Sequence, residues 1–172
     1  AEQTGAKLGF LGESANSVGA QLVGAQPQQG GLNAAQMLAG KGLTGTVLLG
    51  VEPELDAATP AAAMAAVQGA EMVVSLSSFK TSAMDYADAI LPIAAFSETS
   101  GTFVNAEGRV QSFHGSVKPQ GDSRPAWKVL RVLGTMLGLP GFAFETSEEV
   151  KAVALGDLAA LPAKLNNATT AA

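Results

Sequence analysis

The side chains most capable of chemistry gather in one stretch, SETSGTFVNAEGRVQSFHG, at residues 97–115. It contains two carboxylates, Glu98 and Glu107, and the only histidine of the chain, His114. Two carboxylates held in different environments could act as the acid and the base of glycoside hydrolysis. A histidine beside a serine could belong to a Ser-His-Asp triad. These residue types therefore raise the question of an active site.

Neither chemistry has the surrounding pattern that would make it specific. The chain has no GxSxG motif, no Walker A motif, and only GFLGES where a dinucleotide site would show GxGxxG. A triad would have to combine His114 with one of the nearby serines, Ser97, Ser100, Ser112 or Ser116. We therefore assign no catalytic residue and expect His114 to be a surface side chain.

The same stretch is explained more simply as a β-hairpin. TFVN and RVQSF favour strands, and Gly108 in the intervening AEG can adopt the left-handed conformation that a tight turn requires. We assign a similar turn role to Gly101. The polar residues of the hairpin would satisfy loop backbone groups and pair with one another, which would also suit the wall of a cofactor site; they are Asn105, Glu107, Arg109 and Gln111.

Strand-like and helix-like segments alternate ahead of this hairpin. Strands are predicted within 6–12, 47–49, 71–79 and 89–94, and helices within 13–25, 32–42, 59–70 and 80–88. The run Val47 to Leu49 is uninterruptedly apolar, as in a strand that is buried on both faces. The alternation predicts an α/β fold: a small, open, mainly parallel, Rossmann-like sheet with helices on both faces, plus the β-hairpin and C-terminal helices. Ligands of such sheets bind at the carboxyl ends of strands, here GESANS, GVEPE, SSFKTS and PIAAFSETSG.

Two further helices are predicted after the hairpin. One is opened by Pro125 and ended by Gly138, and it carries a basic stripe of Arg124, Lys128 and Arg131. The other begins with a capping box that joins Thr146 to Glu149. The basic stripe is either a solvated face or a contact with another subunit.

Composition excludes several classes of function. The net charge of -5 and the pI near 4.8 disfavour a nucleic-acid partner, because phosphate binding depends on clustered Lys and Arg. The absence of cysteine excludes thiolate-bound iron-sulfur clusters and zinc, and we predict no metal site. No apolar run is long enough for direct insertion into a membrane.

The segment YADAILPIAAFSETSGTFVNAEGRVQSF, residues 86–113, closely resembles the signature of the large iron-sulfur subunits of bacterial NADH-quinone oxidoreductase, respiratory complex I. Its pattern is A-D-x-x-L-P followed by E-x-x-G-T-F-x-N-x-E-G-R-x-Q. The resemblance continues through VKPQGDSRPAWKVLRVLGTMLGLPGF and reaches about residue 144. This family is related in fold to molybdopterin oxidoreductases such as formate dehydrogenase and nitrate reductase.

The resemblance implies a C-terminal, scaffold-forming fragment of the electron-transferring subunit, inactive by itself although the parent complex is an oxidoreductase. Its iron-sulfur clusters would lie in a cysteine-rich N-terminal part that this chain does not include, so no cofactor is expected here. Its partners would be other hydrophilic-arm subunits, on the cytoplasmic side of the bacterial inner membrane. It also implies a molybdopterin oxidoreductase-like domain at 1–144, a helical extension at 145–165 and a frayed tail at 166–172. A vestigial pocket would be lined by Glu98, Asn105, Glu107 and Arg109.

Two alternatives remain open at the level of sequence. The chain could belong to a molybdopterin-dependent oxidoreductase of the formate dehydrogenase or nitrate reductase type and contribute to its pterin site. It could also be a stand-alone adaptor that binds an acidic partner through residues 109–118 and the basic face of 124–131.

Overall fold

A computed structural model describes residues 3–7, 9, 12–39 and 43–165. They fall into two compact units. The sheet unit comprises residues 27–99 and 114–143, and the hairpin unit takes the described parts of 1–26, 100–113 and 144–172. The predicted tail at 166–172 and part of the predicted strand at 6–12 lie outside the described residues.

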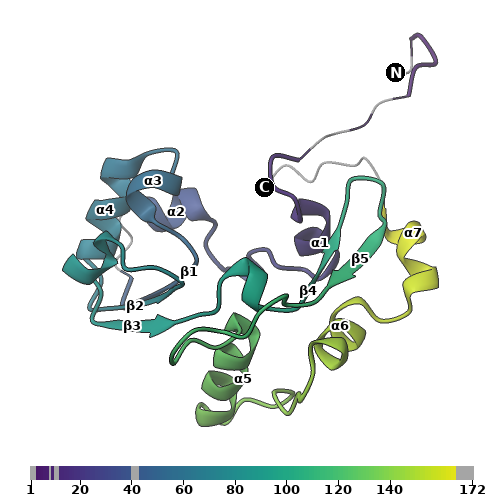
Figure 1. Cartoon of the computed structure of the whole chain (residues 1–172). Coiled ribbons are helices and arrows are strands. Elements are labelled where there is room, and N and C mark those ends of the chain that lie inside the picture. The colour runs from purple at the N-terminus through teal and green to yellow at the C-terminus, as the bar shows by residue number, and fades with distance from the viewer. Residues whose placement is uncertain (1–2, 8, 10–11, 40–42, 166–172) are drawn as a thin grey trace. The chain divides into compact units, whose positions relative to one another are not determined.

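The sheet unit is built on three parallel strands in the order β1-β2-β3, which are β1 (Gly45–Leu49), β2 (Met72–Ser77) and β3 (Ala89–Pro92) (Figure 1). The register pairs Val47 with Val74 and Leu76 with Leu91. Helical segments lie between and after the strands: α2 (Ala34–Leu38), α3 (Pro53–Asp56), α4 (Pro60–Gln68), η1 (Ser82–Asp85), η2 (Phe96–Glu98) and α5 (Ala126–Met136). The predicted mixed α/β fold with a small parallel sheet is thereby confirmed.

Local sequence accounts for the helix boundaries in this unit. Asn33 and Gln36 form a reciprocal capping box at the start of α2, with both hydrogen bonds at 2.9 Å. Pro60 occupies the first turn of α4, where its missing N–H costs nothing, and Gly69 follows the last helical residue. Pro125 likewise precedes α5, whose end is followed by Gly138 with a positive φ of 68°.

One hydrophobic cluster of the sheet unit lies on the face of the sheet that α4 covers. Leu48 and Val73 are buried there against Val67 of α4. On the opposite face Leu76 of β2 is buried, whereas Val47 and Leu49 of β1 are 56% and 44% exposed. The strand predicted at 47–49 is therefore present, but the prediction that it is buried on both faces is wrong within the described chain, because α4 covers one face only.

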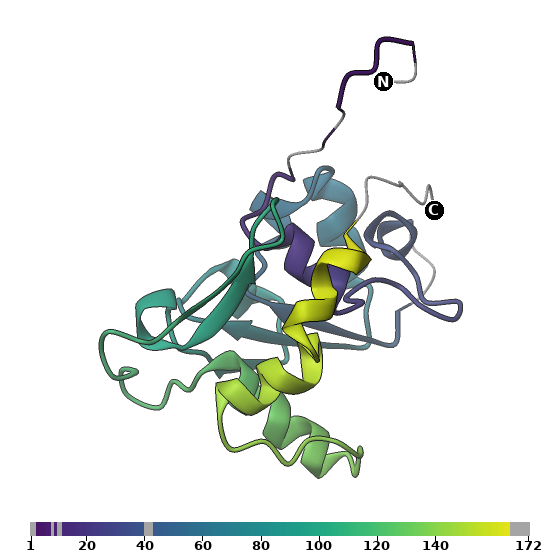
Figure 2. The same ribbon diagram turned by 90° about the vertical axis from the view of Figure 1, so that its right-hand side faces the viewer.

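The hairpin unit joins segments that are distant in sequence. Its elements are α1 (Ser17–Leu22), β4 (Gly101–Val104), β5 (Val110–Phe113), α6 (Ser147–Leu155), η3 (Leu158–Ala160) and α7 (Leu161–Lys164). β4 and β5 pair antiparallel, as predicted for the hairpin. Val104 is buried against Leu155 and Leu161, and α6 and α7 follow one another along the diagonal of Figure 2. Thr146 caps α6 by accepting a hydrogen bond from the N–H of Glu149, which confirms that predicted boundary.

The side chain of Asn16 pairs with β4 instead of capping the helix that follows it. Its Oδ1 accepts a hydrogen bond of 2.8 Å from the N–H of Val104, and its Nδ2 donates one of 3.5 Å to the carbonyl of Thr102. Asn16 is the N-cap residue of α1, but its side chain makes no capping hydrogen bond to that helix. Asn16 therefore satisfies backbone groups along β4 that would otherwise lack a strand partner.

The two glycines of the hairpin serve different purposes. Gly108 has a φ of 80°, as the turn prediction requires. Gly101 is not in the left-handed region, and a Cβ there would lie 2.6 Å from Cζ of Phe113. The predicted turn role of Gly101 is thus wrong: it is needed for the close approach of the Phe113 ring, which packs edge-to-face on Phe103 with centroids 5.4 Å apart.

Replacing Gly108 is expected to destabilise the hairpin unit. Gly108→Val should lower the free energy of unfolding by about 1 kcal/mol or more, because a β-branched residue is strained at positive φ. A Cβ would also overlap the side chain of Leu165. Urea unfolding measures the change. Gly156→Val is the matched control, since Gly156 has a φ of 64° but open space around its Cβ position. If both variants lose the same free energy of unfolding, the overlap with Leu165 adds nothing to the effect of Gly108→Val.

Candidate ligand-binding edge of the parallel sheet

The carboxyl ends of the three parallel strands lie at one edge of the sheet. The segments that follow them are 50–52, which leads into α3, then 78–81 and 93–95. In α/β proteins this edge is where ligands bind, because the loops there are free to vary above a fixed sheet. Gly50 has a φ of 60°, and a Cβ there would meet nothing within 4 Å, so the backbone at the end of β1 borders open space.

The loop after β2 is rich in hydroxyl groups that are used within the protein. Ser77 Oγ donates to the carbonyl of Phe79 at 2.9 Å, and Ser78 Oγ donates to the carbonyl of Ala94 at 3.3 Å. Thr81 Oγ1 accepts from the N–H of Ala83 at 3.2 Å. These bonds fix the shape of the loop, and the bond from Ser78 ties it to the segment after β3.

A carboxylate with two hydroxyl partners joins α3 to the chain after β2. Glu54 Oε1 accepts a hydrogen bond from Ser82 Oγ, and Glu54 Oε2 accepts one of 3.3 Å from the Tyr86 hydroxyl. The bond from Ser82 holds the pKa of Glu54 below its usual value. Burial, followed by the charge and the hydrogen bond of Glu54, raises the pKa of Tyr86 to about 12.

The titration of Tyr86 tests this cluster directly, because it is the only tyrosine of the chain. Ultraviolet absorbance of the phenolate should give a midpoint near pH 12. Since this pKa lies above the ordinary 10.0, the neutral phenol contributes stability that is complete below pH 10 and is lost as the pH rises toward 12. Glu54→Gln should lower the midpoint, whereas Glu71→Gln, which removes an exposed carboxylate, should leave it in place. An unchanged midpoint in Glu54→Gln would refute the coupling.

The four residues predicted to line a pocket occupy different units. Glu98 lies in the sheet unit, where its Oε2 accepts a hydrogen bond of 3.2 Å from the N–H of Ala95. The other three share the turn of the hairpin. Asn105 Oδ1 accepts from the N–H groups of Glu107 and Arg109, at 3.0 and 2.9 Å. The side chains of Glu107 and Arg109 are exposed. The side chains of Glu98 and Asn105 thus bind loop backbone, which is the use that the sequence suggested for Asn105.

No catalytic constellation appears in the described part of the chain. His114 is exposed. The described residues contain no group of three or more His, Cys, Asp or Glu that could hold a metal ion. Over the same residues, no helix has the length and apolarity needed to cross a bilayer.

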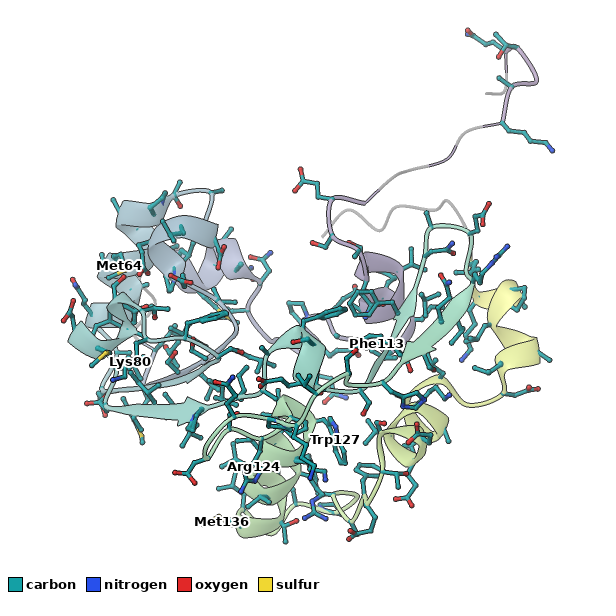
Figure 3. All side chains as sticks on the ribbon, in the orientation of Figure 1. Met64, Lys80, Phe113, Arg124, Trp127 and Met136 are labelled. Carbon is teal, nitrogen blue, oxygen red and sulfur yellow. The ribbon has the colours of Figure 1, made fainter. Side chains whose placement is uncertain are left out.

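The basic residues predicted as a stripe, Arg124, Lys128 and Arg131, differ in their surroundings. Lys128 lies 5.3 Å from the ring centroid of Trp127, and Arg124 donates to the carbonyl of Ser123 at 2.7 Å. Arg131 is only partly exposed. Figure 3 shows Lys80 well apart from Arg124 and Trp127.

The fold is of mixed α/β type, and the carboxyl edge of its parallel sheet is the candidate ligand-binding site. The family model described as "Molybdopterin oxidoreductase" matches residues 2–136. Because that match covers most of the chain, the protein belongs to the molybdopterin oxidoreductase family.

Similar proteins agree with this assignment. Several strains of Staphylococcus aureus contain a protein named "Putative formate dehydrogenase" that is 36% identical over 74 residues, covering 43% of this chain and 8% of the relative. Acetylene hydratase from Pelobacter acetylenicus has a similar fold, with a TM-score of 0.61 at 15% identity, over 88% of this chain and 23% of that chain. The chain thus spans less than a quarter of the length of either relative.

Proposed function

We propose that this chain is a part of a molybdopterin-dependent oxidoreductase of the formate dehydrogenase type, in which the carboxyl edge of the sheet forms one wall of the pterin site. The observation that carries the proposal is the family match over residues 2–136, together with the 36% identity to the formate dehydrogenase-like proteins. The lack of a catalytic constellation among the described residues suits a wall that positions a cofactor.

The residues at this edge are compatible with such a role. The hydroxyls of the 77–82 loop are engaged internally, so recognition would fall to backbone N–H and C=O groups. Gly50, beside open space, and the segment 93–95 offer such groups at the ends of β1 and β3. When bound, the molybdenum centre would supply the redox chemistry. The residues of this chain would hold and orient the organic part of the cofactor.

The proposal is tested on the native protein. An antibody raised against residues 1–172 is used to isolate the antigen from its source without denaturation. Molybdenum is measured by elemental analysis, pterin by its fluorescence after oxidation, and activity by formate-dependent reduction of a dye. Stoichiometric molybdenum and pterin with formate oxidation would support the proposal. If molybdenum and pterin are present but formate is not oxidised, the cofactor part of the proposal stands. The substrate would then be a compound other than formate.

A second candidate is the large iron-sulfur subunit of NADH-quinone oxidoreductase. It is favoured by the continuous E-x-x-G-T-F-x-N-x-E-G-R-x-Q pattern from Glu98 to Gln111. In that case this part would act as scaffold beside other hydrophilic-arm subunits, at the cytoplasmic side of the bacterial inner membrane. The same isolated antigen would then contain iron without molybdenum, migrate in a large membrane complex and oxidise NADH. The two sets of results are mutually exclusive.

A further inference from the structure

A hydrogen-bonded carboxylate links two of the segments at the carboxyl edge of the sheet. Glu54 lies in α3, directly after the 50–52 loop that follows β1. Its two oxygens accept hydrogen bonds from Ser82 and Tyr86, which come directly after the loop that follows β2. We call these three residues, Glu54, Ser82 and Tyr86, the rim cluster. The rim cluster ties the chain after β1 to the chain after β2.

Tyr86 is the member of the rim cluster that the core holds in place. Its ring is partly buried and packs against three buried residues, Leu48, Val67 and Val73. The hydroxyl of Tyr86 is therefore a donor at the end of a side chain that has little freedom to move. Ser82, by contrast, is exposed. A carboxylate that accepts from both hydroxyls attaches α3 to a fixed point of the sheet unit.

The 50–52 loop is attached at both of its ends. At the first end, the N–H of Gly50 donates a hydrogen bond of 2.9 Å to the carbonyl of Leu76 in β2. At the second end, the N–H of Glu52 donates one of 2.7 Å to Oδ2 of Asp56, the last residue of α3. α3 has only four residues, so it depends on contacts with the rest of the unit. The position of the loop therefore depends on how firmly the rim cluster holds α3.

The middle of this loop is available to a ligand. Val51 is 42% exposed, and its N–H donates to no protein acceptor among the described residues. A Cβ at the preceding Gly50 would meet nothing within 4 Å, so there is room beside the backbone. The loop lies at the carboxyl end of a parallel strand, which is where ligands of α/β sheets bind. A backbone donor in this place is useful only if the loop keeps its position.

We propose that Glu54 is a positioning residue of the ligand site at this edge: through Ser82 and Tyr86 it fixes α3, and with it the backbone of the 50–52 loop. The inference rests on the proposed function, in which the ligand is the organic part of the molybdopterin cofactor. Glu54 does not itself bind the ligand, because both of its oxygens already accept hydrogen bonds within the rim cluster. A loop that is fixed in advance loses less conformational freedom when the ligand binds, which strengthens binding.

Retention of pterin by the native protein tests this role. Glu54→Ala removes both acceptors, whereas Glu54→Gln keeps one carbonyl oxygen as an acceptor. Tyr86→Phe removes only the hydroxyl and keeps the ring in the core. Glu71→Ala is the matched control, since Glu71 is an exposed carboxylate at the opposite, amino end of β2. Each protein is dialysed, and the pterin that remains is measured over time by its fluorescence after oxidation. Hydrogen exchange of the peptide 50–56 reports on the loop, and the melting temperature reports on global stability.

The expected result is a local effect of Glu54. Glu54→Ala should release pterin about three- to ten-fold faster than the unchanged protein, the factor that corresponds to one net hydrogen bond. Exchange in the peptide 50–56 should accelerate as well, because the loop opens more often. The melting temperature should stay within about 2 °C, since substitutions of exposed side chains change global stability little. Glu54→Gln should recover part of the retention, and Tyr86→Phe should lie between Glu54→Ala and the unchanged protein.

Three results would overturn the proposal, and they differ in what they leave standing. If Glu54→Ala and Glu71→Ala release pterin at the same rate, Glu54 does not position the site, although the proposed function stands. If faster release in Glu54→Ala comes with a large fall in melting temperature, Glu54 is a residue of general structural importance. If the unchanged native protein contains no pterin, the proposed function fails and this inference fails with it.

Discussion

Leu161→Ala is expected to lower the free energy of unfolding of the hairpin unit by about 2–5 kcal/mol, the range for truncating a buried leucine. Leu161 is 2% exposed and packs with Val104 of β4 and Leu155 of α6. It is also the first residue of α7, which has only four residues and is too short to be stable without such packing. Loss of this side chain removes one of the two buried leucines that pack the C-terminal helices on Val104 of the hairpin.

The neighbouring leucine of η3 provides the control. Leu158 is 47% exposed, so Leu158→Ala makes the same chemical change with little loss of packing. Urea unfolding followed by circular dichroism gives the stability of each variant. Limited proteolysis shows in addition whether residues near α7 are cleaved early. If the midpoints of the two variants coincide, Leu161 does not anchor α7 and the cluster with Val104 and Leu155 is not a core.

Gly115→Ala is expected to destabilise the sheet unit by about 1–3 kcal/mol, the usual cost of inserting a methyl group into packed structure. The added Cβ would lie 2.9 Å from the carbonyl carbon of Glu98 and 3.1 Å from the N–H nitrogen of Thr99. These are backbone atoms, which cannot rotate away as the end of a side chain can. The segment after Gly115 would be displaced, together with the 2.7 Å hydrogen bond from the N–H of Ser116 to the carbonyl of Ser97.

Gly45→Ala is the control for this prediction. Gly45 belongs to the same unit, and the nearest atom to its added Cβ would be the carbonyl oxygen of Met72 at 3.9 Å, an ordinary contact. It should be neutral or slightly stabilising, because alanine restricts the unfolded chain. Hydrogen exchange at Ser116 should accelerate in Gly115→Ala alone. A melting temperature for Gly115→Ala equal to that of Gly45→Ala would mean that the close approach of the two backbones is not important.

Features that depend on a few consecutive residues could be predicted from the sequence. The bond between Thr146 and Glu149, the positive φ of Gly108 and the apolar strand around Leu48 all follow from local chemistry, and the structure has them. The prediction for Gly101 was wrong because a glycine is needed there to make room for the ring of Phe113. Phe113 lies across the hairpin, and local turn rules do not consider such a partner.

The candidate site was predicted only in part, for the same reason. The carboxyl edge of the sheet follows from the alternation of strands and helices. The cluster of Glu54, Ser82 and Tyr86 could not be predicted from the sequence. Ser82 and Tyr86 lie 28 and 32 residues from Glu54, and no known motif joins them to it. Asn16 likewise pairs with Val104, 88 residues away. Such contacts could have been suggested by co-varying positions in related sequences but not by one sequence.

The sequence by itself determined the order of strands and helices, the turn at Gly108 and the resemblance to molybdopterin oxidoreductases, since these depend on residues close together along the chain. Only the tertiary structure decided which face of β1 is covered, which backbone groups Asn16 satisfies and which hydroxyls Glu54 binds. The physical reason is that these outcomes depend on the path of the chain between distant segments. Apolar composition indicates that β1 favours burial, but the path of the chain through α4 determines that the face with Leu48 is the one covered there.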